Sequence, residues 1–330
     1  MIGISGPDPV MKLGVMIEGQ EGVSWDLWRQ LMARVEMLGF ESLWRSDHFM
    51  SMEDSRREAL ETWAALTLTA AETTRLRFGP LVCPMTFRHP SLLARMAASV
   101  DILSGGRLVL GLGAGWNERE HRAFGIPFPS LPERIDQLEE GIEVILRLLG
   151  DGPARFDGRY YQLEGSNPFP KPIQRPRIPL LIGTTGAGRM LRVVARYADE
   201  WDAPGITSPP AYRARRGRLD TYCRNINRDP GEIRCSVSTA YLIGHDAAAL
   251  RRRVAAMQRL MPSLASLDPT AMLEVLQSDG WIVGTPDQIV VQLRALADEG
   301  VERVIFQHND PADFEALELI ASEVMPAVAA

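Results

Sequence analysis

Two side chains that can carry protons stand next to each other in the segment WRSDHF, which runs from Trp44 to Phe49. His48 has an imidazole whose ordinary pKa of about 6.5 suits proton transfer near neutrality, so it is a candidate general acid or base. Asp47 is a candidate hydrogen-bond acceptor for a ligand, or a residue that fixes the loop. The alternative is that both residues are structural, with Asp47 capping a loop and His48 packed at its rim.

Similar clusters follow other apolar, strand-like runs. Glu18 and Gln20 come after the first run, Thr86 and Arg88 come after the third, and GLGAGWN, which ends at Asn117, completes the fourth. GTTGAG at 183–188 follows a fifth run and opens a helix whose first amides would suit an anion. Each glycine run is also compatible with an ordinary turn. All of these clusters nevertheless occupy the same place, directly after a strand.

Short apolar strands alternate with longer amphipathic helices along the chain. The predicted helices include 24–39, 59–71, 91–103 and 131–149. The predicted strands are 12–17, 41–46, 75–83, 107–113, 178–183, 200–203, 236–243 and 301–306. Because each return between successive strands crosses over a helix, the strands should pair in parallel.

This alternation predicts an α/β fold, a single (β/α)8 TIM barrel over residues 1–330 with insertions in the loops at its C-terminal face. A doubly wound sheet is the alternative. Its GxGxxG fingerprint is broken in GLGAGW, where Trp116 would block close packing of the helix. Functional side chains of a barrel gather at the C-terminal ends of the strands. The clusters described above therefore predict one site at that face.

Composition restricts the partners. The chain has 36 Lys and Arg against 42 Asp and Glu, a net charge of −6, which predicts no nucleic-acid partner. Its three cysteines lack CxxC spacing, and we expect neither a signal peptide nor a membrane span, so the protein should be cytoplasmic. The five histidines show no metal-ligand spacing, and no GxSxG motif is present, so we expect no metal and no serine-hydrolase chemistry.

Five ordered motifs together resemble the bacterial luciferase-like superfamily, particularly its oxidoreductases that depend on the deazaflavin coenzyme F420. They are LWRSDHF, GPLVCPMTFRHP, LSGGRLVLGLGAGWNEREHRAFGIPF, IPLLIGTTGAGRMLRVVARYADEWD and VGTPDQIVVQLRALADEGVERVIF. The resemblance spans nearly the whole chain and is weakest over 204–280. It implies hydride transfer between F420 and a small organic substrate, with His48 as proton donor or acceptor. Two alternatives stay open: a monooxygenase that uses flavin mononucleotide (FMN) from a partner reductase, and a non-catalytic flavin-binding relative.

The resemblance also assigns residues to the cofactor. It implies a non-proline cis peptide at Leu81–Val82 that supports the ring, and glycine loops that hold the phosphate, with Arg189 as an assisting cation or a solvent-facing helix residue. The implied cofactor-binding residues are Asp47, Leu81, Val82, Cys83, Gly113, Ala114, Gly115, Gly183, Thr184, Thr185 and Gly186. Family members commonly form homodimers, so we expect one here.

The substrate pocket is expected to include Glu18, Trp116 and Asn117. Sugar-phosphate dehydrogenases of this group carry an acid where this sequence has Trp116, which disfavours a glucose-6-phosphate role. Trp116 and Asn117 instead suggest an apolar wall with one amide; the alternative is that the tryptophan is an ordinary packing residue. The long segments 118–132, 150–179 and 262–281 are predicted to cover the pocket and select the substrate.

Overall fold

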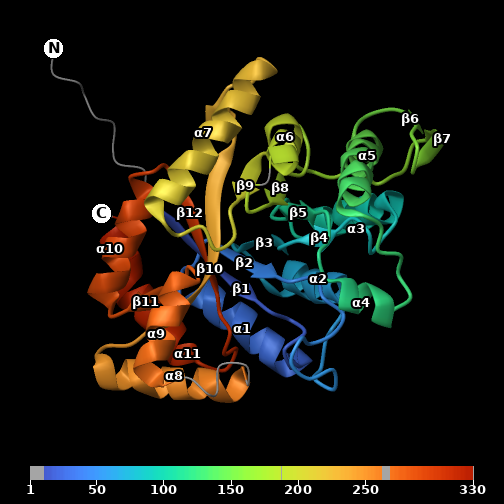
Figure 1. The fold of residues 1–330 in the computed structure, drawn as a ribbon. Helices are drawn as coiled ribbons and strands as arrows, with labels where there is room; N and C mark the ends of the chain where they lie inside the picture. Colours follow the sequence, from blue (N-terminus) through green and yellow to red (C-terminus); the bar gives the residue numbers. More distant parts are fainter. Residues whose placement is uncertain (1–10, 187, 262–267, 330) are drawn as a thin grey trace, which may run out of the picture.

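The computed structural model describes residues 11–186, 188–261 and 268–329. Parallel strands form a central barrel with helices on its outside (Figure 1). The strands are β1 (Lys12–Ile17), β2 (Ser42–Arg45), β3 (Arg77–Pro80), β4 (Cys83–Pro84), β5 (Leu110–Gly113), β8 (Leu180–Gly183), β9 (Glu200–Asp202), β10 (Arg234–Ile243) and β12 (Arg303–Gln307). Their order is β3-β2-β1-β12-β10-β9-β8-β5-β4, and a parallel bridge between Phe78 and Leu108 closes the ring. The predicted TIM barrel is therefore confirmed.

Local sequence sets where the helices begin. The Ser24 hydroxyl accepts a hydrogen bond from the Leu27 amide and caps the first helix, while capping boxes at Ser130 and Thr285 start two others. The helices are α1 (Trp25–Met37), α2 (Thr62–Glu72), α3 (Pro90–Leu103), α4 (Glu118–Ala123), α5 (Leu131–Leu149), α6 (Gly188–Tyr197), α7 (Pro209–Asn225), α8 (Ala247–Leu260), α9 (Pro269–Ser278), α10 (Pro286–Ala297), α11 (Phe314–Leu319) and α12 (Met325–Val328). No helix within the described ranges is long and apolar enough to cross a membrane.

Side chains of the strands fill the barrel interior, beginning at the N-terminal ends of the strands. Because successive strand residues point to opposite faces, one set packs inside and the other packs against the helices. At the N-terminal end, the buried guanidinium of Arg303 pairs with Glu200 at 2.6 Å and with Glu41 at 2.8 Å. The apolar layer inside the barrel consists of Met16, Trp44, Leu81, Val109, Leu181 and Ile305. Among the described residues, the space inside the barrel that a ligand could occupy therefore lies at its C-terminal end.

Two additions extend the barrel. One is an antiparallel hairpin of β6 (Ala154–Asp157) and β7 (Gln162–Ser166), which lies beside α5 at the outer edge of the molecule (Figure 1). Strand β10 continues past the barrel and pairs with β11 (Ile282–Gly284), and α8 and α9 pack on this extension. Residues 262–267, part of the predicted cover over 262–281, lie outside the described residues. Residues 1–10, which bear on the expected lack of a signal peptide, lie outside them too.

Candidate functional site

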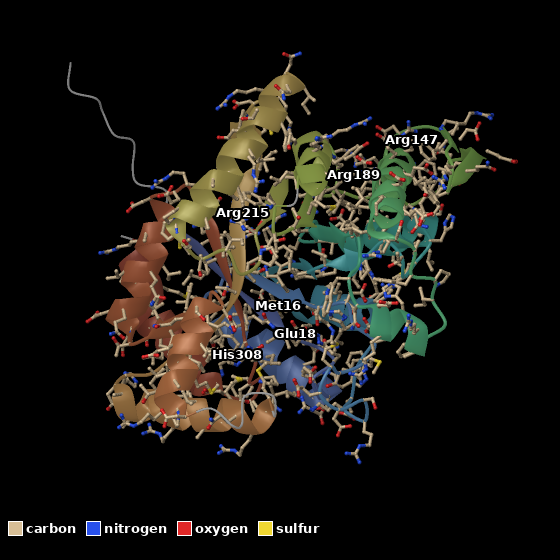
Figure 2. All side chains as sticks on the ribbon, in the orientation of Figure 1. Met16, Glu18, Arg147, Arg189, Arg215 and His308 are labelled. Carbon is tan, nitrogen blue, oxygen red and sulfur yellow. The ribbon has the colours of Figure 1, made fainter. Side chains whose placement is uncertain are left out.

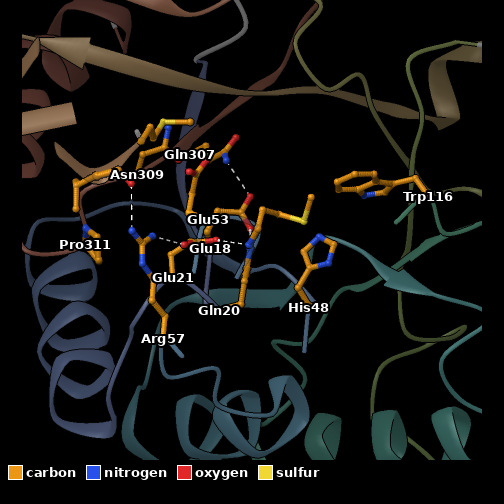
Figure 3. A pocket seen from close by; sticks show the side chains of 13 residues that line it. Glu18, Gln20, Glu21, His48, Glu53, Arg57, Trp116, Gln307, Asn309 and Pro311 are labelled. Carbon is orange, nitrogen blue, oxygen red and sulfur yellow. Dashed lines mark hydrogen bonds and ion pairs between the residues drawn. The ribbon is translucent and has the colours of Figure 1, made fainter. Parts of the chain in front are cut away.

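Two adjoining cavities open at the C-terminal ends of the strands and share Glu18, His48, Trp116 and Gln307. The inner cavity, of about 280 Å³, is lined in addition by Met16, Ser46, Leu81, Val82, Pro84, Gly115, Gly183, Asp202, Pro204 and Ser238. The outer cavity, of about 230 Å³, is lined in addition by Gln20, Glu21, Met52, Glu53, Arg57, Leu260, Met261, Asn309 and Pro311 (Figure 3). The predicted site at the C-terminal face therefore corresponds to a divided pocket.

His48 stands where the two cavities meet, and its orientation is set by Glu120. The Nδ1–H of His48 donates to Oε2 of Glu120 at 2.8 Å, because an ionised carboxylate can only accept. The opposite ring nitrogen, Nε2, is therefore the one left for the cavities. The ring also packs edge-on against Trp116, with 5.6 Å between ring centroids.

Glu120 is a functional residue that the sequence interpretation missed. Its side chain is fully buried, and it also accepts hydrogen bonds from the Phe49 and Met50 amides. Asn117 caps the N-terminus of α4 by accepting from the Glu120 amide at 3.2 Å, which holds Glu120 in the first turn. The visible signal was an acid three residues after an Asn cap, but such a pattern usually marks only a helix start.

The electrostatics of this pair favour a charged imidazole. Burial works against protonation of His48, but the hydrogen bond to Glu120 and the nearby charges of Glu18 and Asp47 outweigh it and raise the His48 pKa above its ordinary value. Burial likewise works against ionisation of Glu120, while the bonds from His48 and the backbone amides lower its pKa. The pair can therefore hold or release a proton near neutrality.

Asp47 and Asn117 occupy different places from those predicted. Asp47 is fully buried and forms a two-point ion pair with Arg88, which also pairs with Glu61. Neither Asp47 nor Asn117 lines either cavity within the described part of the chain. Of the two roles considered for Asp47, the geometry agrees with fixing the loop that carries His48. Asn117 acts as a helix cap rather than as an amide in a pocket wall.

Leu81 and Val82 form one wall of the inner cavity, and the peptide bond between them is cis, as predicted. The predicted single strand over 75–83 is therefore two strands, β3 and β4, separated by these residues. A Cβ at Gly113 would lie 2.6 Å from Val82 Cγ2, and a Cβ at Gly183 would lie 3.2 Å from Val82 Cγ1. These glycines therefore make room for the Val82 side chain, a role that the sequence interpretation had not assigned to them.

The remaining cofactor candidates fall into three groups. Gly115, with φ of +81°, and Gly183 line the inner cavity. Cys83 and Ala114 are buried beside it, and burial raises the pKa of the Cys83 thiol, so it is an inert packing group. The residues Thr184, Thr185 and Gly186 form the turn before α6, where the Gly186 amide donates to the Thr184 hydroxyl at 3.2 Å.

Two arginines near this turn differ in their partners. Arg189 pairs with Asp136 and Glu139 of α5, so its charge is already neutralised, and Figure 2 shows it between α6 and α5. The assisting role suggested for Arg189 therefore does not fit. Arg215 of α7 donates from Nε to the Thr185 carbonyl at 2.7 Å, which fastens the turn to α7.

Glu18 is the acid at the boundary between the cavities. Its Oε2 accepts from the Gln20 amide group and its Oε1 from that of Gln307, both at 2.8 Å. Trp116 is 65% exposed and forms a wall of both cavities rather than packing in the core. The predicted pocket positions of Glu18 and Trp116 agree with this geometry.

Asp202, at the end of β9, is a second acid that the sequence interpretation missed. It lines the inner cavity and accepts from the Ser238 hydroxyl at 2.6 Å and from the Ser236 hydroxyl at 3.2 Å. Burial raises the Asp202 pKa to about 7, helped by repulsion from Glu200 and opposed by the serine hydrogen bonds. A lone acid within a predicted strand gave no sign of this environment.

The long connections behave differently from the prediction. The described segments 118–132 and 150–179 supply no lining residue to either cavity, although Glu120 reaches His48 from the first of them. The second carries the β6–β7 hairpin, whose Phe156 lies under Arg147 of α5 on the outside of the barrel. Of the described residues next to the third segment, 262–281, Leu260 and Met261 at the end of α8 line the outer cavity. No cluster of metal-ligating residues occurs in the described ranges.

A family described as luciferase-like monooxygenase matches residues 11–303. The chain belongs to this family. One relative is the F420-dependent hydroxymycolic acid dehydrogenase of Mycobacterium tuberculosis, 27% identical over 98% of this chain and 91% of the relative. Another is the F420-dependent glucose-6-phosphate dehydrogenase of Microbacterium testaceum, 26% identical over 88% of this chain and 90% of the relative.

This luciferase-like chain also has the fold of solved structures. A monooxygenase from Streptomyces bottropensis superposes with a TM-score of 0.80 over 96% of this chain and 99% of the other, at 21% identity. At this identity the likeness concerns the fold alone. The superfamily assignment made from the five motifs is therefore confirmed, and the barrel assignment is confirmed independently.

Proposed function

We propose that this protein is an oxidoreductase that uses coenzyme F420 to move a hydride to or from a small organic molecule, with His48 giving or taking the accompanying proton. The observation that carries the proposal is the His48–Glu120 pair, whose free imidazole nitrogen faces the boundary between two cavities. The names of the two relatives, both F420-dependent dehydrogenases, support the choice of cofactor.

The inner cavity fits a flat ring system. Leu81 and Val82 provide an apolar wall, and Gly115 and Gly183 add no side chains to the space in front of it. The volume of about 280 Å³ is close to the lower end of the roughly 300–1,000 Å³ usual for small-molecule sites. In this proposal the ring binds in the inner cavity, and its anionic side chain extends towards the turn at Thr184 to Gly186, which precedes the N-terminus of α6.

In this proposal the substrate binds in the outer cavity. F420, when bound, accepts or supplies the hydride at its ring. For an alcohol substrate, the carbinol carbon gives up a hydride to the cofactor and the alcohol oxygen gives up its proton to neutral His48. The alcohol thereby becomes a carbonyl compound, and the reverse reaction returns the hydride to the carbon and the proton to the oxygen. Glu120 orients the imidazole and stabilises it once protonated, while Trp116 limits the access of water to the boundary.

Parallel binding titrations test this proposal. Purified protein is titrated with F420 and, separately, with FMN, and the fluorescence of the tryptophans, including Trp116 in the pocket, is followed to obtain both Kd values. The proposal predicts tight F420 binding and much weaker FMN binding. The reverse preference would contradict it and favour the second candidate, an FMN-dependent monooxygenase, which is in line with the family description.

A further inference from the structure

The outer cavity is acidic, and the one guanidinium among its described lining residues is already neutralised. Glu18, Glu21 and Glu53 line it together with Arg57. Arg57 forms an ion pair with Glu21 and donates a further hydrogen bond to the Leu260 carbonyl at 3.2 Å. No guanidinium or ammonium group among the described lining residues is therefore left to receive an anionic substrate.

The cationic side chains around the cavities are already engaged: Arg45 and Arg119 donate to backbone carbonyls, and His48 donates to Glu120. The inner cavity has no Lys or Arg among its described lining residues, and Asp202 adds another acid there. An anion in this pocket would lose its hydration and face carboxylates, and both effects are unfavourable.

Glu18 is the acid with unused capacity. Each of its oxygens accepts one hydrogen bond, from the neutral amides of Gln20 and Gln307, whereas a carboxylate can accept about four. The buried Arg45 acts on Glu18 only through space, since its described hydrogen bonds go to backbone carbonyls. Glu18 therefore presents a negative charge to both cavities, ready for a further donor.

The outer cavity also has an apolar wall. Its hydrophobic lining residues are Met52, Trp116, Leu260, Met261 and Pro311. Two of them are methionines, whose flexible side chains adapt to ligands of different shape. The cavity thus combines the Glu18 carboxylate with an adaptable hydrophobic wall.

We propose that the substrate is an uncharged or cationic alcohol or carbonyl compound that carries a second hydroxyl or amino group. This proposal rests on the proposed function. The reacting carbon of the substrate lies beside His48, its second polar group donates to Glu18, and its hydrocarbon body packs on the apolar wall. Anionic compounds, sugar phosphates included, are rejected. A hydrogen bond to a charged acceptor is worth about 1.5–3 kcal/mol, so the second group should improve binding about 10- to 100-fold.

A matched series of cyclohexane ligands tests this proposal. Cyclohexanol, cyclohexane-1,4-diol, 4-aminocyclohexanol and 4-hydroxycyclohexanecarboxylate share one ring and differ only in the second group. Their Kd values are measured by saturation-transfer NMR and calorimetry on the F420-loaded protein, and F420 binding itself is measured separately. The variants are Glu18→Gln and, as control, Glu72→Gln, since Glu72 pairs with Arg29 on the outer helices.

We expect the diol and the amino alcohol to bind about tenfold or more tightly than cyclohexanol, and the carboxylate to bind more weakly than all of them. Glu18→Gln should remove most of the gain for the amino alcohol and improve the carboxylate, whereas Glu72→Gln should change nothing. The proposed substrate class would be wrong if the carboxylate bound as tightly as the diol. It would also be wrong if the four ligands kept the same order of affinity in Glu18→Gln. Loss of F420 binding in the separate titration would instead contradict the proposed function.

Discussion

The imidazole of His48 and the buried carboxylate of Glu120 are joined by a 2.8 Å hydrogen bond across 72 residues of sequence. One residue comes from the loop after β2 and the other from α4, so only the closed barrel brings them together. This bond decides which ring nitrogen faces the pocket and raises the pKa of the imidazole.

Replacing Glu120 by Gln should lower the His48 pKa. The substitution keeps the shape of the side chain but removes the charge that stabilises the imidazolium, while burial continues to oppose protonation. This lowering of the His48 pKa is measured by NMR titration of protein labelled with ¹⁵N-histidine. Glu118→Gln, on the exposed side of α4, is the control. An unchanged His48 pKa in Glu120→Gln would show that Glu120 does not control the imidazole.

Asp47→Ala should lower the free energy of unfolding, because Arg88 loses an ion-pair partner. It leaves a largely buried guanidinium without its two-point partner, and breaking such a pair costs about 3–5 kcal/mol in the free energy of unfolding. Urea unfolding measures this loss. Asp54→Ala removes a comparable but exposed pair with Arg56 and should have little effect. Wild-type stability in Asp47→Ala, with activity abolished, would favour the cofactor-contacting role instead.

The Gly113→Ala variant should disturb the cofactor wall. The new Cβ would lie 2.6 Å from Val82 Cγ2, and relief of this overlap must move Val82, which lines the inner cavity. Overpacking of this kind costs about 1–3 kcal/mol, and F420 should bind more weakly. Gly217→Ala is the control, since a Cβ there meets nothing within 4 Å and alanine suits a helix. Unfolding and F420 titrations on both variants give the comparison. Unchanged F420 affinity in Gly113→Ala would show that the position of Val82 does not affect cofactor binding.

Asp202 should make stability depend on pH. Its pKa is about 7 in the folded protein against about 3.9 in an unfolded chain, so the folded protein binds more protons between these values. The free energy of unfolding should therefore fall as pH rises from about 4 to about 7, by up to about 4 kcal/mol from this group. Asp202→Asn removes the ionisation, so its stability relative to wild type should rise over the same range. A difference independent of pH would show that Asp202 is ionised throughout.

Much of the fold was predictable because it depends on local patterns. The apolar runs and the caps at Ser24 and Thr285 mark strands and helices in the sequence itself. The cis bond between Leu81 and Val82 was predictable only through the family resemblance, since nothing in the residue types requires it.

The parts of the site that were missed depend on distant neighbours. Glu120 matters because α4 brings it to His48, and Asp202 matters because β10 places two serines beside it. Asp47 was given a role toward the cofactor, but it is bound to Arg88, which reaches it from the loop after β4. Such pairings appear only when the strands are arranged around the barrel, so spacing along the chain does not reveal them.

The most direct test of the central claim is the turnover of His48→Gln compared with wild type, using F420 and the most active alcohol of the neutral series. Because glutamine cannot carry the proton, kcat should fall more than about tenfold, while the Kd for F420 stays within about threefold of wild type. Unchanged kcat in His48→Gln would contradict the account, because the proton would then travel by a route that does not include the His48–Glu120 pair.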